Sequence, residues 1–180
     1  MNCARLERDE AAAIQALALL PPEGVPFRPK LVAPPEYYVA LVAELFGRPA
    51  DAEKAYLATR AHLQKILAEQ PENAPAWSVL GFVQAGLGQK EEAINAGRRA
   101  CELLPLAREA TAGATALTDL VRIYVRVGEN DLALQMLSSR TEEALMNYGY
   151  LSLHSDWDTV RDDPRFQSYM ARFAPPTASR

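Results

Sequence analysis

The chain has 180 residues, and its 19 lysines and arginines against 23 aspartates and glutamates give a formal charge of −4 at neutral pH. This length suits one domain with a substantial buried core or a stack of small helical repeats, so a second domain is not required. The acidic balance gives no general attraction for phosphate backbones or anionic lipid, so we expect neither nucleic acid nor a membrane as a partner.

Thiols and targeting signals are sparse. Cys3 and Cys101 have no metal-type spacing, so they predict neither a disulfide framework nor a zinc site, and we expect Cys101 to be a small buried hydrophobic residue. The first ten residues are charged where a signal peptide turns apolar, and no run approaches the roughly 18 apolar residues of a membrane span. We therefore expect a soluble, cytoplasmic chain, although a targeting segment in a longer parent protein stays open.

The apolar residues predict an all-α fold. They recur at helical spacing, and no stretch sustains the alternation that half-buried strands require. The first predicted element is a helix over residues 1–20, which Pro21 and Pro22 end.

Residues 21–35 contain six prolines and cannot continue a helix. This segment is either an ordered strap across the helices or a linker. Because Val25, Phe27, Leu31 and Val32 give it apolar side chains to bury, we favour the strap.

A repeat organises the rest of the chain. The segments GRPADA, GQKEEA and GENDLA start at Gly47, Gly88 and Gly128, at steps of 41 and 40 residues, and each has an alanine five residues after the glycine. We expect each glycine to end one helix in the left-handed conformation, and each alanine to lie where two helices approach closely. The repeat predicts helical hairpins over residues 36–70, 71–105 and 106–145, then a C-terminal cap over 146–173 and a flexible tail over 174–180.

The middle hairpin resembles a known family. The residues that carry the resemblance are Trp77, Leu80, Gly81, Gly88, Ala93, Ala100 and Pro105. They are similar to the tetratricopeptide (TPR) signature, and Pro71 and Pro105 lie one family period of 34 residues apart. The match departs at Gln84 and Gly97, where aromatic residues are usual. The resemblance implies an α-α superhelix of about three TPR-like hairpins.

A second resemblance covers about Pro71 to Phe173. The stretch contains, in order, GRRACELLPLAREATAG, LVRIYVRVGENDLAL and DWDTVRDDPRFQSYM. This succession resembles the C-terminal TPR region of bacterial serine/threonine protein kinases and related signalling proteins, including adenylate cyclase-like and winged-helix regulators. It implies a sensory or docking module of a signalling system.

Catalytic motifs are missing from the sequence. It has no Gly-rich phosphate loop, no His-Arg-Asp or Asp-Phe-Gly motif, and no GxSxG, P-loop or HExxH pattern. His62 lies within a predicted helix between Ala61 and Leu63, where a structural or surface role is the better interpretation. We therefore expect no enzyme activity, no cofactor and no metal.

The segment HSDWDTVRDDPRF, from His154 to Phe166, is the densest group of chemically capable side chains. One interpretation is a metal or acid/base site built from His154, Asp156, Asp158, Asp162 and Asp163. The other is a lid over the last hairpin, in which Asp163 caps a helix that starts at Pro164, and Asp156 and Asp158 cap a short preceding turn. We favour the lid, with an apolar face of Trp157, Phe166, Tyr169, Met170 and Phe173. Of these, Trp157 and Phe166 are the predicted buried anchors.

By the resemblance, the first helices of the hairpins line a groove for a peptide or protein partner. The groove positions are Tyr37, Leu41, Glu44, Ser78, Phe82, Thr118, Arg122 and Arg126. Arg122 and Arg126 share one helix face and could receive a carboxylate or phosphate. The alternative is that they are solvated or pair with Asp119 and nearby acids, and the sequence leaves both open.

Two functions fit these patterns. The first is a non-enzymatic module that binds a peptide or protein in the groove of a short TPR superhelix, as a scaffold does. The second is the regulatory C-terminal part of a bacterial multidomain kinase or adenylate cyclase-like protein. Pairing with a second copy is a further expectation, because a groove or an exposed terminal repeat can bind its counterpart.

Overall fold

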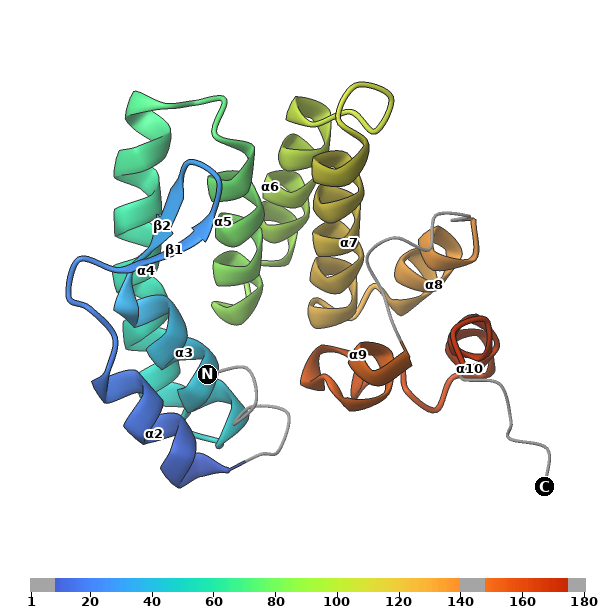
Figure 1. Ribbon diagram of the computed structural model, residues 1–180, viewed down its shortest axis with the longest axis horizontal. Helices are drawn as coiled ribbons and strands as arrows, with labels where there is room; N and C mark the ends of the chain where they lie inside the picture. Colours follow the sequence, from blue (N-terminus) through green and yellow to red (C-terminus); the bar gives the residue numbers. More distant parts are fainter. Residues whose placement is uncertain (1–8, 140–147, 175–180) are drawn as a thin grey trace.

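The computed structural model describes residues 9–139 and 148–174, and most of them are helical (Figure 1). The expected helical class is confirmed, with two short strands added. The helices are α2 (Glu10–Ala18), α3 (Pro35–Leu45), α4 (Pro49–Glu69), α5 (Ala74–Gly86), α6 (Lys90–Leu103), α7 (Ala110–Arg126), α8 (Asn130–Ser138), α9 (Tyr148–Leu153) and α10 (Pro164–Ala171), with a 3-10 turn, η1 (Ser155–Trp157). The start of the predicted 1–20 helix, residues 140–147 and nearly all of the predicted tail lie outside the described residues.

The three repeat glycines end helices as predicted. Gly47, Gly88 and Gly128 have φ angles of 69°, 72° and 80°, the left-handed region that glycine enters without a steric penalty. The amide N–H that follows each glycine donates to the carbonyl oxygen five residues before it, over 2.8, 2.9 and 2.8 Å. The alanine five residues after each glycine is buried. The sequence repeat is therefore also a repeat of local structure.

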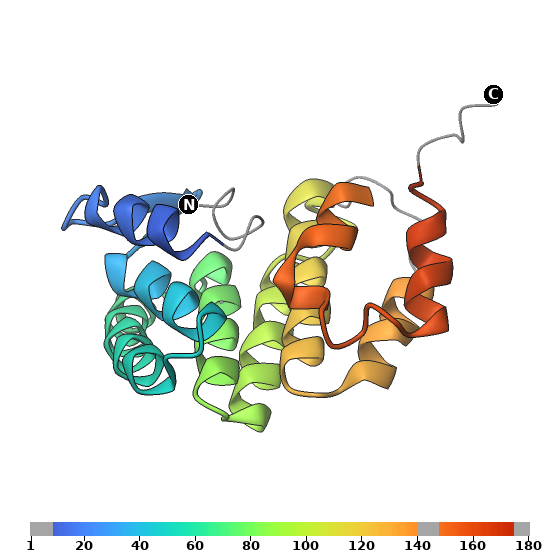
Figure 2. The same cartoon turned by 90° about the horizontal axis from the view of Figure 1, so that it is seen from below.

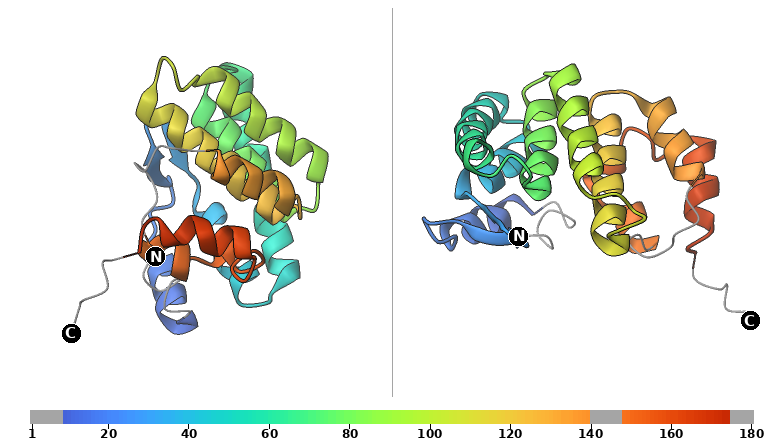
Figure 3. Two further views of the ribbon diagram at one scale, coloured as in Figure 1. Left: turned by 90° about the vertical axis from the view of Figure 1, so that its right-hand side faces the viewer. Right: turned by 90° about the horizontal axis from the view of Figure 1, so that it is seen from above.

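Consecutive helices pack on one another. The packing runs from α3 to α4, α5, α6, α7 and α8, and α5 also contacts α7. Figures 1 and 3 show α4 to α7 side by side across the molecule. Glycine permits the close approach of α5 and α6, because a Cβ on Gly81 would lie 3.1 Å from the carbonyl oxygen of Ala93. Gly97 plays a similar part, since Ile123 and Leu120 of α7 fill the space where its side chain would be.

The proline-rich segment is an antiparallel hairpin of β1 (Val25–Arg28) and β2 (Leu31–Ala33). These residues pair with one another and pack against the helices, and the all-α prediction missed the strands. Leu31 is buried but Val32 is exposed, so the prediction that both are buried is wrong for Val32, which β pleating turns away from Leu31. Asn73 Nδ2 donates to Lys30 O over 2.9 Å and ties the turn to the start of α5.

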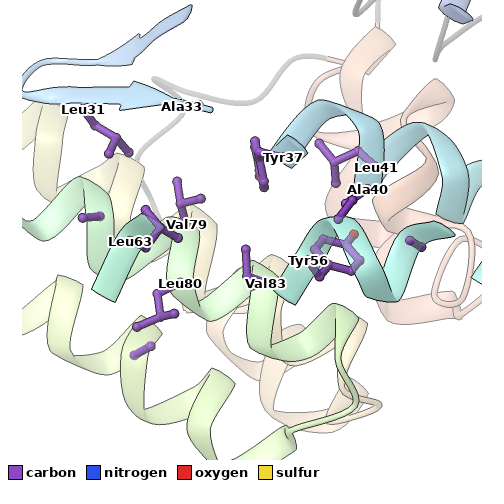
Figure 4. Close-up of a cluster of buried hydrophobic side chains, with 14 of the residues drawn as sticks. Leu31, Ala33, Tyr37, Ala40, Leu41, Tyr56, Leu63, Val79, Leu80 and Val83 are labelled. Carbon is purple, nitrogen blue, oxygen red and sulfur yellow. The ribbon is translucent and has the colours of Figure 1, made fainter. Parts of the chain in front are cut away.

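The largest buried cluster joins the hairpin to the first helices. It combines Leu31 of β2, Tyr37 and Leu41 of α3, Tyr56 of α4 and Val79 of α5, among others (Figure 4). Figure 4 shows these side chains directed toward one another from four elements that follow one another along the chain. The hairpin is therefore part of the core of this half of the molecule.

The C-terminal segment covers the other end. Asp163 Oδ1 accepts the Arg165 amide N–H over 2.8 Å, and Pro164 is the first residue of α10, so the predicted helix start is confirmed. Trp157 and Phe166 are both fully buried, as predicted, in a cluster that includes α7 and α8. Cys101 packs against this cluster but is only partly buried, so the expectation of a small buried hydrophobic residue is met in part.

The hairpin and the C-terminal segment approach α7 from opposite ends of the row of helices. Figure 1 shows the hairpin in front of α4 and α5, and α9 beneath the lower end of α7. Figure 2 shows both segments on the same side of the row. The face of α3, α5 and α7, which we call the α3–α5–α7 face, is thus approached by both segments.

A packing prediction follows for Gly86. A Cβ at this position would lie 2.6 Å from Cζ of the buried Tyr56 ring, which has little room to move. Although alanine favours a helix by about 1 kcal/mol over glycine, overpacking should dominate. We expect Gly86→Ala to lower the free energy of unfolding by about 1–3 kcal/mol in urea denaturation.

The exposed Ala61 of α4 supplies the reference. Ala61→Gly should lower the free energy of unfolding by about 1 kcal/mol, since only helix propensity changes there. A Gly86→Ala protein that is more stable than the wild type would contradict the packing described for Tyr56.

Candidate functional site

Three charged residues lie along one face of α7. Asp119, Arg122 and Arg126 occupy positions i, i+3 and i+7 of the helix and therefore project in similar directions. Their partners come from three distant elements: Arg28 of β1, Asp156 of η1 and Glu44 of α3. We call these six residues the α7 ion network.

Asp119 is the most deeply buried charge of the network, at 1% exposure. Arg28 Nη1 and Nη2 donate to its Oδ2 and Oδ1 over 2.5 and 2.9 Å, a bidentate pair. Arg122 Nη1 lies 3.4 Å from Oδ1 and adds a second positive charge. A buried carboxylate needs such partners, so this contact anchors the hairpin to α7.

Arg122 joins the C-terminal segment to the same helix. Its Nε donates to Asp156 Oδ2 over 2.6 Å, Nη2 pairs with the same oxygen, and the guanidinium lies 4.6 Å from the ring centroid of Phe82. Burial alone would lower the pKa of Arg122, but the Asp156 carboxylate, with weaker help from Asp119, outweighs it and raises the pKa above its ordinary value. The guanidinium therefore stays charged and holds η1 on α7.

Arg126 connects α7 to α3 and α4. Its Nη2 donates to Glu44 Oε1 and Oε2 over 2.8 and 2.7 Å and to the Tyr56 hydroxyl over 3.1 Å. The Tyr56 hydroxyl in turn donates to Glu44 Oε2 over 2.6 Å. Burial raises the pKa of Tyr56 far above its ordinary value, so the hydroxyl stays protonated and remains a donor.

Two neighbouring cavities flank the network. The first, which we call the aromatic cavity, has a volume of about 210 Å³ and is lined by Phe27, Tyr37, Tyr38, Leu41, Phe82, Arg122, Arg126, Tyr150, His154 and Asp156. The second, the polar cavity, has a volume of about 350 Å³ and is lined by Leu41, Glu44, Leu45, Ala85, Val125, Arg126, Ser155, Asp156, Asp158 and Thr159. Leu41, Arg126 and Asp156 form the wall between them.

The structure brings most of the predicted groove positions to these cavities. Tyr37, Leu41, Phe82, Arg122 and Arg126 line the aromatic cavity, and Glu44 lines the polar one. The other two positions line neither cavity. Ser78 is buried, and Thr118 donates its hydroxyl to Ala114 O over 2.9 Å within α7. The alternative in which both arginines pair with nearby acids is confirmed.

Several lining residues were not predicted from the sequence. Phe27 and Tyr38 come from the hairpin and the start of α3, and Tyr150 and His154 come from the C-terminal segment. The sequence patterns place Arg28 only within the proline-rich segment and give it no role. Its position beside Phe27 in an otherwise apolar strand is the one local signal, because a charge there requires a partner.

The acidic C-terminal segment is used differently from the prediction. The bonds found within the described residues give both aspartates other partners: Asp156 pairs with Arg122, and Asp158 accepts from Arg161 over 2.6 Å. Instead, His154 Nδ1 caps η1 by accepting the Asp156 amide N–H over 3.3 Å. Within residues 9–139 and 148–174, no three His, Cys, Asp or Glu side chains are grouped to hold a metal ion.

None of the helices in the described part of the chain combines the length and apolar character of a membrane span. Comparisons of the chain with protein-family models, curated proteins and solved structures gave no match. The site is therefore interpreted from its own geometry.

The network makes a stability prediction. Asp119→Asn keeps the shape of the side chain but leaves Arg28 without its counter-charge and Arg122 with Asp156 alone, so the free energy of unfolding should fall by about 3–5 kcal/mol. Arg28→Met should cost less, since Asp119 keeps Arg122. Urea denaturation measures both, with Arg99→Met at an exposed pair as the control, where about 0–1 kcal/mol is expected. Equal losses for Asp119→Asn and Arg99→Met would contradict the role of Asp119.

The same anchor predicts resistance to trypsin. Arg28 is followed by Pro29, so the relevant site is the bond after the exposed Lys30. We expect slow cleavage there in the native protein and clearly faster cleavage in Arg28→Met, because the hairpin then loses its tie to α7. Cleavage after Lys65 within α4 reports global unfolding and should not change. Fast cleavage after Lys30 in the wild type would show that the hairpin is not held.

Proposed function

We propose that the chain is a non-enzymatic interaction module that binds a peptide or protein segment on the α3–α5–α7 face. In this proposal the helical hairpins form a short TPR-like superhelix. The single observation that carries it is that six of the eight predicted groove positions line two adjoining cavities with aromatic, apolar and charged walls. Such mixed concave surfaces are typical of binding sites.

The shape of the face limits the partner. The hairpin reaches α7 through Arg28, and η1 reaches it through Asp156, so both ends of the face are bridged by the chain itself. A long helix laid along the face would have to displace two buried ion pairs, which is costly. A single inserted side chain or a short extended segment fits without such a change. We therefore propose a short linear motif as the partner.

A second candidate is regulatory. The succession of segments from Pro71 onward resembles the TPR region that follows bacterial kinase domains, and the α7 ion network contacts both the N-terminal hairpin and the C-terminal segment. A module of this kind could act on an enzyme in the same polypeptide. The reading frame upstream of Met1 separates the two candidates, because a continuous catalytic domain there favours regulation in cis.

Peptide selection tests the main proposal. A random peptide library is displayed and selected against the chain, and the selected peptides are titrated by fluorescence anisotropy. Tyr38 is half-buried and lines the aromatic cavity, whereas its neighbour Val39 faces away from that cavity. We expect Tyr38→Ala to weaken binding about tenfold or more, as removal of a central aromatic contact does, and Val39→Ala to leave it within about twofold.

If no peptide is selected, or if the selected peptides respond to Val39→Ala and not to Tyr38→Ala, the α3–α5–α7 face is not the binding surface.

A further inference from the structure

The aromatic cavity has an unusual combination of features. Five of its lining residues are aromatic: Phe27, Tyr37, Tyr38, Phe82 and Tyr150. The rings of Phe27 and Tyr37 meet edge to face at 5.7 Å, as do those of Tyr37 and Tyr38 at 5.6 Å. Walls of this kind favour a flat apolar body, because aromatic rings stack or meet edge to face with other rings.

Arg126 has donors that the protein does not use. Every hydrogen bond that it makes within the described residues comes from Nη2, which serves Glu44 and Tyr56. Its Nε and Nη1 have no acceptor in that part of the chain, and neither is among the fully buried nitrogens, so both stay accessible. Because the residue lines the aromatic cavity, an occupant of the cavity can accept a hydrogen bond from them.

The charges of the network favour a neutral acceptor over an anion. The α7 ion network holds three guanidiniums and three carboxylates, so its formal charges cancel. An anion would bring an uncompensated charge into a partly buried site, at a desolvation cost. A cation would meet the guanidiniums of Arg122 and Arg126 directly.

We propose that the aromatic cavity binds an uncharged planar group bearing a carbonyl oxygen. The ring lies among the aromatic walls, and the oxygen accepts from Nε or Nη1 of Arg126. The inference rests on the proposed function in that both place a ligand on the same face. The chemistry could come from a free small molecule or from the aromatic side chain and neighbouring amide of a bound peptide.

Three probes of nearly the same shape but different charge show which ligand charge the cavity prefers. Benzamide, benzoate and benzamidinium are titrated against the full chain, with the Nε–Hε resonance of Arg126 followed by NMR. Benzamide should bind with a Kd on the order of 1 mM, as expected for a fragment, and should shift that resonance. Benzoate should bind about tenfold more weakly because of its unmatched charge, and benzamidinium should not bind. N-acetylphenylalanine amide separates the sources, since it tests whether a peptide unit also fits.

Variants supply the controls. Arg126→Met removes the free donors, and Glu44, at 43% exposure, keeps its bond from Tyr56 and its contact with water, so the fold should persist. This variant should lose benzamide binding, while Arg99→Met, at an exposed pair on α6, should not. In Glu44→Gln the network gains one positive charge, so benzoate should gain about tenfold relative to benzamide.

Each result decides the question. Three results would overturn the inference: tighter binding of benzoate than of benzamide, no binding by any probe, or an Arg126 resonance that does not shift in the wild type. The resonance is measured on the wild type, so it does not depend on the folding of a variant. If benzamide binds while peptide selection fails, the proposed function fails alone. If peptides bind on this face but acidic ones are selected, the inference fails alone.

Discussion

The arrangement of the whole molecule depends on one buried carboxylate. Asp119 is 1% exposed, and a charge in such a place is tolerated only with good partners. Arg28 approaches it from the hairpin, 91 residues away in sequence, and Arg122 from one turn further along α7. Buried pairs of this kind often contribute little net stability compared with an apolar core, yet they penalise every arrangement that leaves the charge alone. Asp119 therefore fixes where the hairpin lies.

From that anchor the rest of the α3–α5–α7 face is built. Arg122 continues the line of charges toward η1, and Arg126 toward α3, so one face of α7 is joined to both elements. The apolar clusters on either side of α7 supply the burial, but apolar packing has no preferred direction. The ion pairs are directional, and they leave two cavities between the elements that they join. Glu44, Arg122, Arg126 and Asp156 therefore both join the elements and line the cavities between them.

The sequence predicts the local parts of this structure well. The glycines at 47, 88 and 128 signal helix ends because the left-handed conformation is a property of the residue itself. The Asp163–Pro164 helix start is equally local. The hairpin was missed because two strands of four and three residues are too short to show alternation among prolines. The pairing of Arg126 with Glu44 joins residues 82 apart, and nothing in a chain with 19 cationic and 23 anionic side chains singles out that pair.

The acidic segment near the C-terminus combines features that local sequence rules predict with one that depends on a distant residue. Its helix start and its buried aromatics follow from local rules, which is why Trp157 and Phe166 could be placed from sequence. Asp156 follows no local rule, because its role depends on Arg122, which lies 34 residues earlier. It is at once the contact that closes the C-terminal segment onto α7 and a wall of both cavities. The segment therefore does more than cover the last hairpin, because the α3–α5–α7 face takes one of its sides from it.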